Sequence, residues 1–354
     1  MLQQHVLQPA PGPPEGVAVC VRGAKWGSLE HAAPTMRTNV FQRLDATDVF
    51  GVLELAQNET TLFGMALPET RAEREKCCKG LLGAVKCSVQ TSSEYFSDLE
   101  ALAFFNNIQL FMRQTRNVRG DPGVWKAMRS MHLQRLECMH LIEAHEKTRG
   151  RPYRTYASVR SDLVFYEPLR DSFVQRFQSL SPSDGLVPSG DDWGPPGHPV
   201  VGMNDNLFFG GVHAFRSDAL QWRIIRDNKT FVSHTWNPEM LVSLAQQIGH
   251  NSIAREDVAY CKISDKGACR YFGQLSLSRS LLGPDWLRQH SEAAALLCEA
   301  AKGPCNDAGH GSGLNVQTFA DKEADPGWCH LIDDVIQANA CPKGFKGETK
   351  KQHE

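Results

Sequence analysis

The chain contains none of the short motifs that identify common metal, redox or phosphate-binding sites. Its eleven cysteines include no pair with the C-x-x-C spacing of zinc ribbons and thioredoxin-like proteins. No H-E-x-x-H sequence supports zinc-protease chemistry, and neither a P-loop nor a G-x-G-x-x-G motif follows a strand-like run. Function must therefore be inferred from residues that lie far apart along the chain.

Long apolar runs and an excess of one charge are also missing. No segment approaches the roughly eighteen consecutive apolar residues of a membrane-spanning helix. The formal net charge is −2, and no stripe of Lys and Arg alternates with aromatic residues. We therefore expect no transmembrane segment in this chain and no nucleic-acid partner. The composition, 41% hydrophobic and 22% charged, is sufficient to bury a core.

Composition divides the chain into three parts. Residues 1–16 are rich in Pro and Gly and have no apolar signal-peptide core, which predicts a flexible lead-in. Residues 17–282 carry strand and helix patterns and are predicted to form one domain, whereas residues 283–354 are predicted to be an irregular, cysteine-containing extension. If the protein enters the Golgi or another secretory lumen, its anchor lies upstream of this chain; otherwise we expect a cytoplasmic protein.

The cysteines do not decide the compartment. Cys20 in a predicted strand and Cys138 in a predicted helix suit small buried apolar residues, and the odd total leaves at least one thiol unpaired within the chain. In an oxidising compartment, disulfides could form within the late group, which comprises Cys261, Cys269, Cys298, Cys305, Cys329 and Cys341.

Apolar strand patterns alternate with helical patterns along the predicted domain. A strand at 17–21 is followed by a turn signal at Arg22-Gly23, a helix within 29–44 and a second strand at 48–55. This β-α-β unit implies parallel strands and a right-handed crossover. Further strands are expected at 82–89, 155–165, 207–211 and 252–261, helices at 98–116, 124–147, 217–227 and 237–249, and irregular segments at 56–80 and 181–202. We predict an α/β fold with a mostly parallel, Rossmann-like sheet flanked by helices.

The stretch 155–165 is the centre of the functional prediction. It has the β-branched and aromatic residues of a core strand, yet it contains Arg160 and Asp162, two positions apart and so on one face of a strand. The two side chains could pair with each other. Alternatively, they could stand at the carboxyl end of the strand, where open α/β sheets bind ligands.

Two further polar positions adjoin apolar segments. The segment 204–206, Asn-Asp-Asn, leads directly into the strand at 207–211, and Glu239 lies in the first turn of a predicted helix. Local structure could explain each of them, because Asn and Asp bond their own backbone in turns and the helix dipole favours an acid in the first turn. Gly23 could likewise serve only a turn.

The order of these features resembles that of GT-A-type glycosyltransferases. The similarity is to a little-characterised group with a first strand ending in Gly and Arg, an h-R-x-D-h-x-F strand in which h is apolar, and an N-D-x-h-h-h-G strand followed by P-E-h-L. Here these marks fall on 22–23, 159–165, 204–210 and 238–241, and the resemblance covers residues 16–263. It implies a GT-A-like nucleotide-sugar-binding domain.

The resemblance implies an enzyme of the hexosyltransferase type that moves a sugar from a UDP- or GDP-linked donor to a hydroxyl of a glycan, glycoprotein or glycolipid. The departing diphosphate is neutralised by a divalent cation, Mn²⁺ or Mg²⁺, or by Arg and Lys. The D-x-D motif of GT-A enzymes is matched by Arg160-Ser161-Asp162, with one carboxylate in place of two. Asp162 would then be the metal ligand and Arg160 a phosphate ligand.

The same resemblance assigns the remaining roles. Asp205 would accept the proton of the acceptor hydroxyl as a general base, and Glu239 is the second candidate for this role. The residues implied to bind the nucleotide sugar are Arg22, Gly23, Arg160, Asp162 and Asn204.

Two alternatives remain open. A non-catalytic GT-A-like protein could bind a sugar or a partner without transfer, which the single carboxylate at Asp162 favours. A metal-dependent hydrolase built on the Asp- and His-rich segment 184–213 has less support, because that segment shows no recognised ligand spacing. If Asp162 serves the donor, we expect Asp162→Asn to abolish donor binding or metal dependence in a folded protein. Unfolding of this variant would instead indicate a structural ion pair.

Overall fold

The computed structural model covers most of the predicted domain. The described residues are 12–24, 26–55, 70–91, 94, 98–106, 122–165, 167–189, 203–227, 238–263 and 269–271. The predicted extension 283–354 and the distal part of the helix predicted at 98–116 lie outside these residues. The division of the chain into three parts therefore stays a prediction.

A seven-stranded sheet forms the centre of the fold, in the order β3-β2-β1-β4-β7-β6-β8. Four of its six strand pairs are parallel, and β7 runs antiparallel to both of its neighbours. The strands are β1 (Val17–Gly23), β2 (Asp48–Leu55), β3 (Lys86–Thr91), β4 (Thr155–Arg160), β6 (Asp184–Pro188), β7 (Leu207–Gly210) and β8 (Ser252–Glu256). The predicted α/β fold with a mostly parallel sheet is confirmed.

A second, three-stranded sheet corrects two of the predicted strands. It consists of β5 (Leu163–Phe165), β9 (Tyr260–Ile263) and β10 (Cys269–Tyr271), paired antiparallel in the order β10-β9-β5. The single strand predicted at 155–165 is therefore two strands in different sheets, broken by a turn at Ser161 and Asp162. The strand predicted at 252–261 is likewise divided into β8 and β9.

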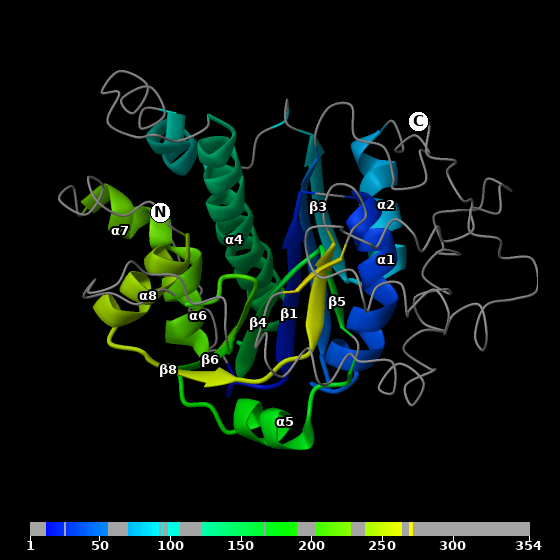
Figure 1. The fold of residues 1–354 in the computed structure, drawn as a ribbon, viewed down its shortest axis with the longest axis vertical. Helices are drawn as coiled ribbons and strands as arrows, with labels where there is room; N and C mark the ends of the chain where they lie inside the picture. The colour runs from blue at the N-terminus through cyan, green and yellow to red at the C-terminus, as the bar shows by residue number, and fades with distance from the viewer. Residues whose placement is uncertain are drawn as a thin grey trace, which may run out of the picture.

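Helices cover both faces of the central sheet (Figure 1). On one face lie α1 (Trp26–Met36), its π-helical continuation η1 (Arg37–Phe41) and α2 (Arg71–Leu82). On the other face lie α4 (Pro122–Arg149) and α6 (Val212–Ala219), and α5 (Asp171–Gln178) lies at one end of the molecule. Two further helices are α7 (Gln221–Asp227) and α8 (Pro238–Ile248). Among the described residues, no helix is long and apolar enough to cross a membrane.

Successive side chains of β1 point to opposite faces of the sheet and pack in two different cores. Val17, Val19 and Val21 pack in the core beneath α1 and α2, whereas Ala18 and Cys20 pack in the core beneath α4. Successive strand side chains point to opposite faces of a sheet. Arg22 therefore lies on the α4 side.

The helix α2 and the strand β6 occupy segments that the sequence predicts to be irregular. Thr70 and Glu73 form a capping box at the start of α2, and Gly83 ends it in the left-handed conformation with φ 66°. Only four residues of α2 are buried, so its helical period is weak.

Two disulfides join pairs of the elements that the structure describes. Cys20–Cys138 connects β1 to α4, and Cys78–Cys87 connects α2 to β3. The interpretation of Cys20 and Cys138 as small buried apolar residues is therefore incomplete. Both cysteines are fully buried, as predicted, but their sulfur atoms are bonded to each other.

Candidate functional site

The candidate site lies where the strand order of the sheet reverses. Strand β1 pairs with β2 on one side and with β4 on the other, and all three run parallel. Arg22 and Arg160 are register partners at the carboxyl ends of β1 and β4. Open α/β sheets bind ligands outside the carboxyl ends of their strands at such a switch point.

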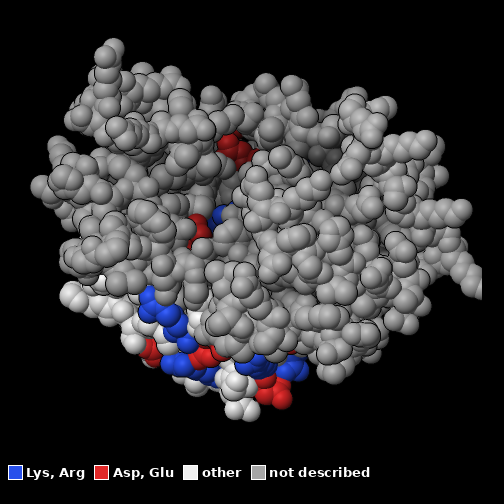
Figure 2. Space-filling model, viewed as in Figure 1, with Lys and Arg blue, Asp and Glu red and all other residues white. Residues whose placement is uncertain are grey.

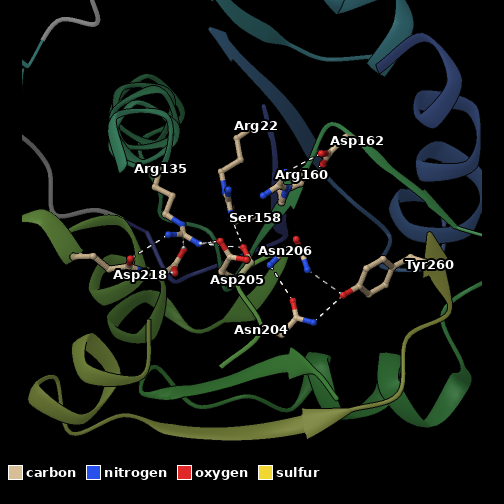
Figure 3. A network of polar contacts seen from close by, with 11 residues as sticks. Arg22, Arg135, Ser158, Arg160, Asp162, Asn204, Asp205, Asn206, Asp218 and Tyr260 are labelled. Carbon is tan, nitrogen blue, oxygen red and sulfur yellow. Dashed lines mark hydrogen bonds and ion pairs between the residues drawn. The ribbon is translucent and has the colours of Figure 1, made fainter. Parts of the chain in front are cut away.

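Two buried arginines converge on one carbonyl group beside this position (Figure 3). Nη2 of Arg22 donates to the backbone oxygen of Asp205 at 2.8 Å, and Nη2 of Arg135, from α4, donates to the same oxygen at 3.1 Å. Nε of Arg22 also donates to Oγ of Ser158 at 2.8 Å. The sequence places Asp205 more than 180 residues after Arg22, and the fold brings them into direct contact.

Carboxylates balance the two arginines. Asp218 lies 3.5 Å from Nε of Arg135 and the Asp205 carboxylate lies 3.9 Å from its Nη2. Gln221 accepts from Nη1 of Arg135 and donates to Asp218. Burial, followed by the positive charge of Arg135, lowers the pKa of Arg22 to about 9.

Arg160 and Asp162 form a bidentate ion pair. Nε and Nη2 of Arg160 donate to the two carboxylate oxygens of Asp162 at 2.9 and 2.7 Å. Burial opposes the charge of Arg160, but the charge and hydrogen bonds of Asp162 outweigh it and raise the pKa of the guanidinium above its usual value. The two side chains bind each other, and they also stand at the carboxyl end of β4. Ligand binding by this pair stays a prediction.

Gly23 is required by close packing rather than by turn geometry. A Cβ atom at this position would lie 1.7 Å from Oγ of Ser161 and 2.7 Å from its Cβ. Gly23 is not among the described residues with positive φ. The backbone of β1 therefore passes directly against the Ser161–Asp162 turn, and the Ser161 amide donates to the Arg22 carbonyl at 2.7 Å.

Asn204 and Asn206 bind Tyr260 across the site. The Asn204 amide donates to the Tyr260 hydroxyl oxygen at 2.8 Å and the Asn206 amide does so at 3.4 Å. The Asn206 backbone amide also donates to Oδ1 of Asn204 at 2.9 Å, which is the turn chemistry that the sequence allows for this segment. Tyr260 on β9 thus connects the second sheet to the candidate site (Figure 3).

Glu239 is not among the described side chains. Its backbone lies in the first turn of α8, whose Gln246 donates to the Ala214 carbonyl of α6 at 3.1 Å. The role predicted for Glu239 stays a prediction.

The predicted cation has a limited set of ligands. Asp162 is the proposed ligand, and Arg160 binds both of its oxygens. In the part of the chain that the structure describes, no group of three or more His, Cys, Asp and Glu side chains could hold an ion. A protein-held Mn²⁺ or Mg²⁺ takes several oxygen ligands. These residues do not fit a cation held by side chains alone.

Arg135, Asp218 and Tyr260 have no role in the prediction from the sequence. The burial of Arg135 could have been predicted from the sequence, because this residue lies one turn before Cys138 and one residue before Leu136 within the apolar face of α4. A buried arginine on such a face requires a carboxylate partner. The identity of that partner, Asp218, depends on the packing of α6 against α4.

His132 lies one turn before Arg135 on α4 and is almost fully buried. Its ring stacks on Phe105 with centroids 5.3 Å apart, and both ring nitrogens are buried with no hydrogen-bond partner among the described residues. Burial, followed by the charge of Arg135, lowers the pKa of His132 to about 3.

We expect His132→Phe to remove part of the acid sensitivity of the fold. Between the unfolded pKa near 6.5 and the folded value of about 3, the unfolded chain binds the extra proton, so the free energy of unfolding falls as the pH falls. At pH 5 this histidine should lower stability by about 2 kcal/mol relative to pH 7. Urea unfolding at both pH values would measure the difference between wild type and variant.

Phe105→Leu is the matched control for that experiment. It removes the stacked ring but keeps His132, so its loss of stability between pH 7 and pH 5 should equal that of wild type. An unchanged pH dependence in His132→Phe would mean that the imidazole is protonated in the folded state.

Surface charge at the α5 end of the molecule is mixed. Figure 2 shows the described Lys and Arg side chains interspersed with Asp and Glu around this end. Two of the ion pairs there are Arg43–Asp171 and Arg176–Glu256. The absence of a nucleic-acid partner stays a prediction.

Comparisons with known proteins identify no family for the chain. No family model and no curated protein matches it. Among solved structures it is similar to core-mannan synthase A from Aspergillus fumigatus in an Mn/GDP form, with 11% identity, a TM-score of 0.39, and coverage of 69% of this chain and 73% of that chain. Mouse xyloside xylosyltransferase 1 in its apo form is similar at 11% identity and a TM-score of 0.34, over 68% of this chain and 85% of that chain. Both TM-scores are below 0.5, so functional inference rests on the residues of this chain.

Proposed function

We propose that the chain is a glycosyltransferase that moves a sugar from a nucleotide-sugar donor to a hydroxyl acceptor. The observation that carries this proposal is the pairing of Arg22 and Arg160 in register at the carboxyl ends of β1 and β4. A guanidinium group matches the geometry of a phosphate, and this position is the switch point of the sheet. UDP- or GDP-linked hexoses are the donors that the sequence resemblance implies.

The proposed chemistry assigns the arginines to the leaving diphosphate and the carboxylates to the attacking hydroxyl. Transfer releases a nucleoside diphosphate, whose developing charge Arg160, Arg22 and Arg135 would stabilise. The attacking hydroxyl loses a proton, for which Asp205 is the proposed base and Glu239 the second candidate. Asn204 and Gly23 would line the donor. Mn²⁺ or Mg²⁺, if it binds with the diphosphate, would add positive charge there.

A thermal-shift screen tests this proposal. UDP, GDP, CMP and their sugar conjugates are compared with and without Mn²⁺. One nucleotide should raise the melting temperature with the logarithm of its concentration, and saturation at about 100 times Kd corresponds to about 2.7 kcal/mol. Uridine and guanosine, which lack phosphates, are the matched controls and should produce no shift.

A non-catalytic binding protein is the second candidate function. Three arginines and three aspartates of the site neutralise one another, and Arg160 already binds both oxygens of Asp162. This closed arrangement is the observation that supports a structural or binding role. Saturable nucleotide binding without sugar transfer or donor hydrolysis would support the second candidate, and the absence of any nucleotide shift would contradict the first.

A further inference from the structure

We propose that the Cys20–Cys138 disulfide positions the candidate site, by holding the helix that carries Arg135 against the strand that carries Arg22. The test of this inference by nucleotide affinity rests on the proposed function. The inference also implies that the site takes its final geometry only where thiols are oxidised, as in a secretory lumen.

The two cysteines share faces with the two arginines. Cys20 precedes Arg22 by two residues on β1, so both side chains point toward α4. Cys138 follows Arg135 by three residues on α4, so these side chains lie on neighbouring turns of one helix face. The covalent bond therefore lies next to the point where the two guanidinium groups meet.

The arrangement needs a restraint because like charges meet there. Arg22 and Arg135 donate to a single carbonyl oxygen, that of Asp205, in a buried environment. Two positive charges in such a setting repel each other, which acts to move α4 away from β1. The compensating carboxylates are 3.5 and 3.9 Å from Arg135, longer than good hydrogen bonds.

The other end of α4 is held in a different way. Glu146 accepts hydrogen bonds from the Tyr153 amide at 2.9 Å and the Tyr156 hydroxyl at 2.7 Å. These bonds anchor the carboxyl-terminal turns of α4 to the start of β4. The disulfide provides the corresponding attachment near Arg135, and its burial makes it a permanent link and not an accessible redox switch.

The second disulfide provides a matched control. Cys78–Cys87 joins α2 to β3, and both sulfurs pack in the core on the opposite face of the sheet from α4. It closes a loop with a sequence separation of 9, against 118 for Cys20–Cys138. Its loss should lower stability without moving either arginine.

The test compares Cys20→Ala/Cys138→Ala and the better-packed Cys20→Val/Cys138→Ala with Cys78→Ala/Cys87→Ala. Circular dichroism first establishes folding, and calorimetry then measures affinity for UDP and GDP below the melting temperature of every variant. The Cys20/Cys138 variants should bind about tenfold or more weakly than wild type, because preorganisation of the phosphate-binding arginines is lost. The Cys78/Cys87 variant should bind as wild type does.

The outcomes separate this inference from the proposed function. If all variants bind the nucleotide with equal affinity, or all lose affinity equally, the Cys20–Cys138 disulfide does not position the site. Failure of both Cys20/Cys138 variants to fold would also overturn the inference. If wild type binds neither nucleotide, the proposed function fails, and hydrogen exchange decides the inference instead. Faster exchange at 129–140 in the Cys20/Cys138 variants alone would support it, and no difference between the two disulfides would overturn it.

Discussion

Asp162→Asn should lower the free energy of unfolding by about 3 kcal/mol. The carboxylate accepts two hydrogen bonds from Arg160, and the two side chains are only 10% and 22% exposed. Removing one member of a buried pair leaves the other charge desolvated and unpaired, which costs about 3–5 kcal/mol, and the partial exposure of Arg160 favours the lower end. Denaturant unfolding at pH 7 would measure the change.

A double-mutant cycle provides the control. Arg160→Gln/Asp162→Asn should be less destabilised than the sum of the two single variants, since neither charge is then left unpaired. Asp227→Asn removes a carboxylate from the exposed Arg226–Asp227 pair and should leave stability unchanged within error. Additive single variants would mean that Arg160 and Asp162 do not depend on each other.

This expectation differs from the one that sequence alone supports. From the sequence, a folded Asp162→Asn variant without donor binding is the outcome that marks a donor ligand. The bidentate contact to Arg160 predicts loss of stability in addition. Nucleotide affinity therefore has to be measured on the folded fraction, where a selective loss would still assign Asp162 to the donor.

The fold was predictable where periodicity is strong. The strands β1 and β2 and the helix α8 have clear apolar runs and end signals. Their observed bounds therefore lie within a few residues of the predicted ones. The break between β4 and β5 was not predictable, because apolar residues continue on both sides of Ser161 and Asp162. The chain changes sheets there, and only the pairing of β5 with β9 reveals it.

The candidate site was predictable only in its strand-end members. Arg22, Arg160, Asn204 and Asp205 each follow or precede an apolar run, and parallel strands bring such positions to one edge. In the structure, Arg22 donates to the backbone oxygen of Asp205. Tyr260 could not be foreseen, because its contact with Asn204 spans 56 residues and depends on the second sheet.

Asp205→Asn should lower kcat by about 10²–10⁴-fold if Asp205 is the general base. The substitution keeps the backbone oxygen to which Arg22 and Arg135 donate, but it removes the carboxylate that lies 3.9 Å from Nη2 of Arg135. The asparagine side chain has the same shape but cannot accept the proton of an acceptor hydroxyl. Donor affinity should therefore be retained while turnover is lost, which steady-state kinetics with the nucleotide sugar identified in the thermal-shift screen would measure.

Asp218→Asn separates base catalysis from electrostatic support. Asp218 is also buried and lies closer to Arg135, at 3.5 Å against 3.9 Å for Asp205, so each substitution removes one negative charge beside the same guanidinium. If the carboxylates only neutralise Arg135, the two variants should lose similar activity and stability. If Asp205 takes the proton, only Asp205→Asn should lose turnover at unchanged KM. Equal losses of activity in the two variants would leave Glu239 as the candidate base, and kinetics of Glu239→Gln would test it. The carboxylates of Asp205 and Asp218 around Arg135 would then have a structural role.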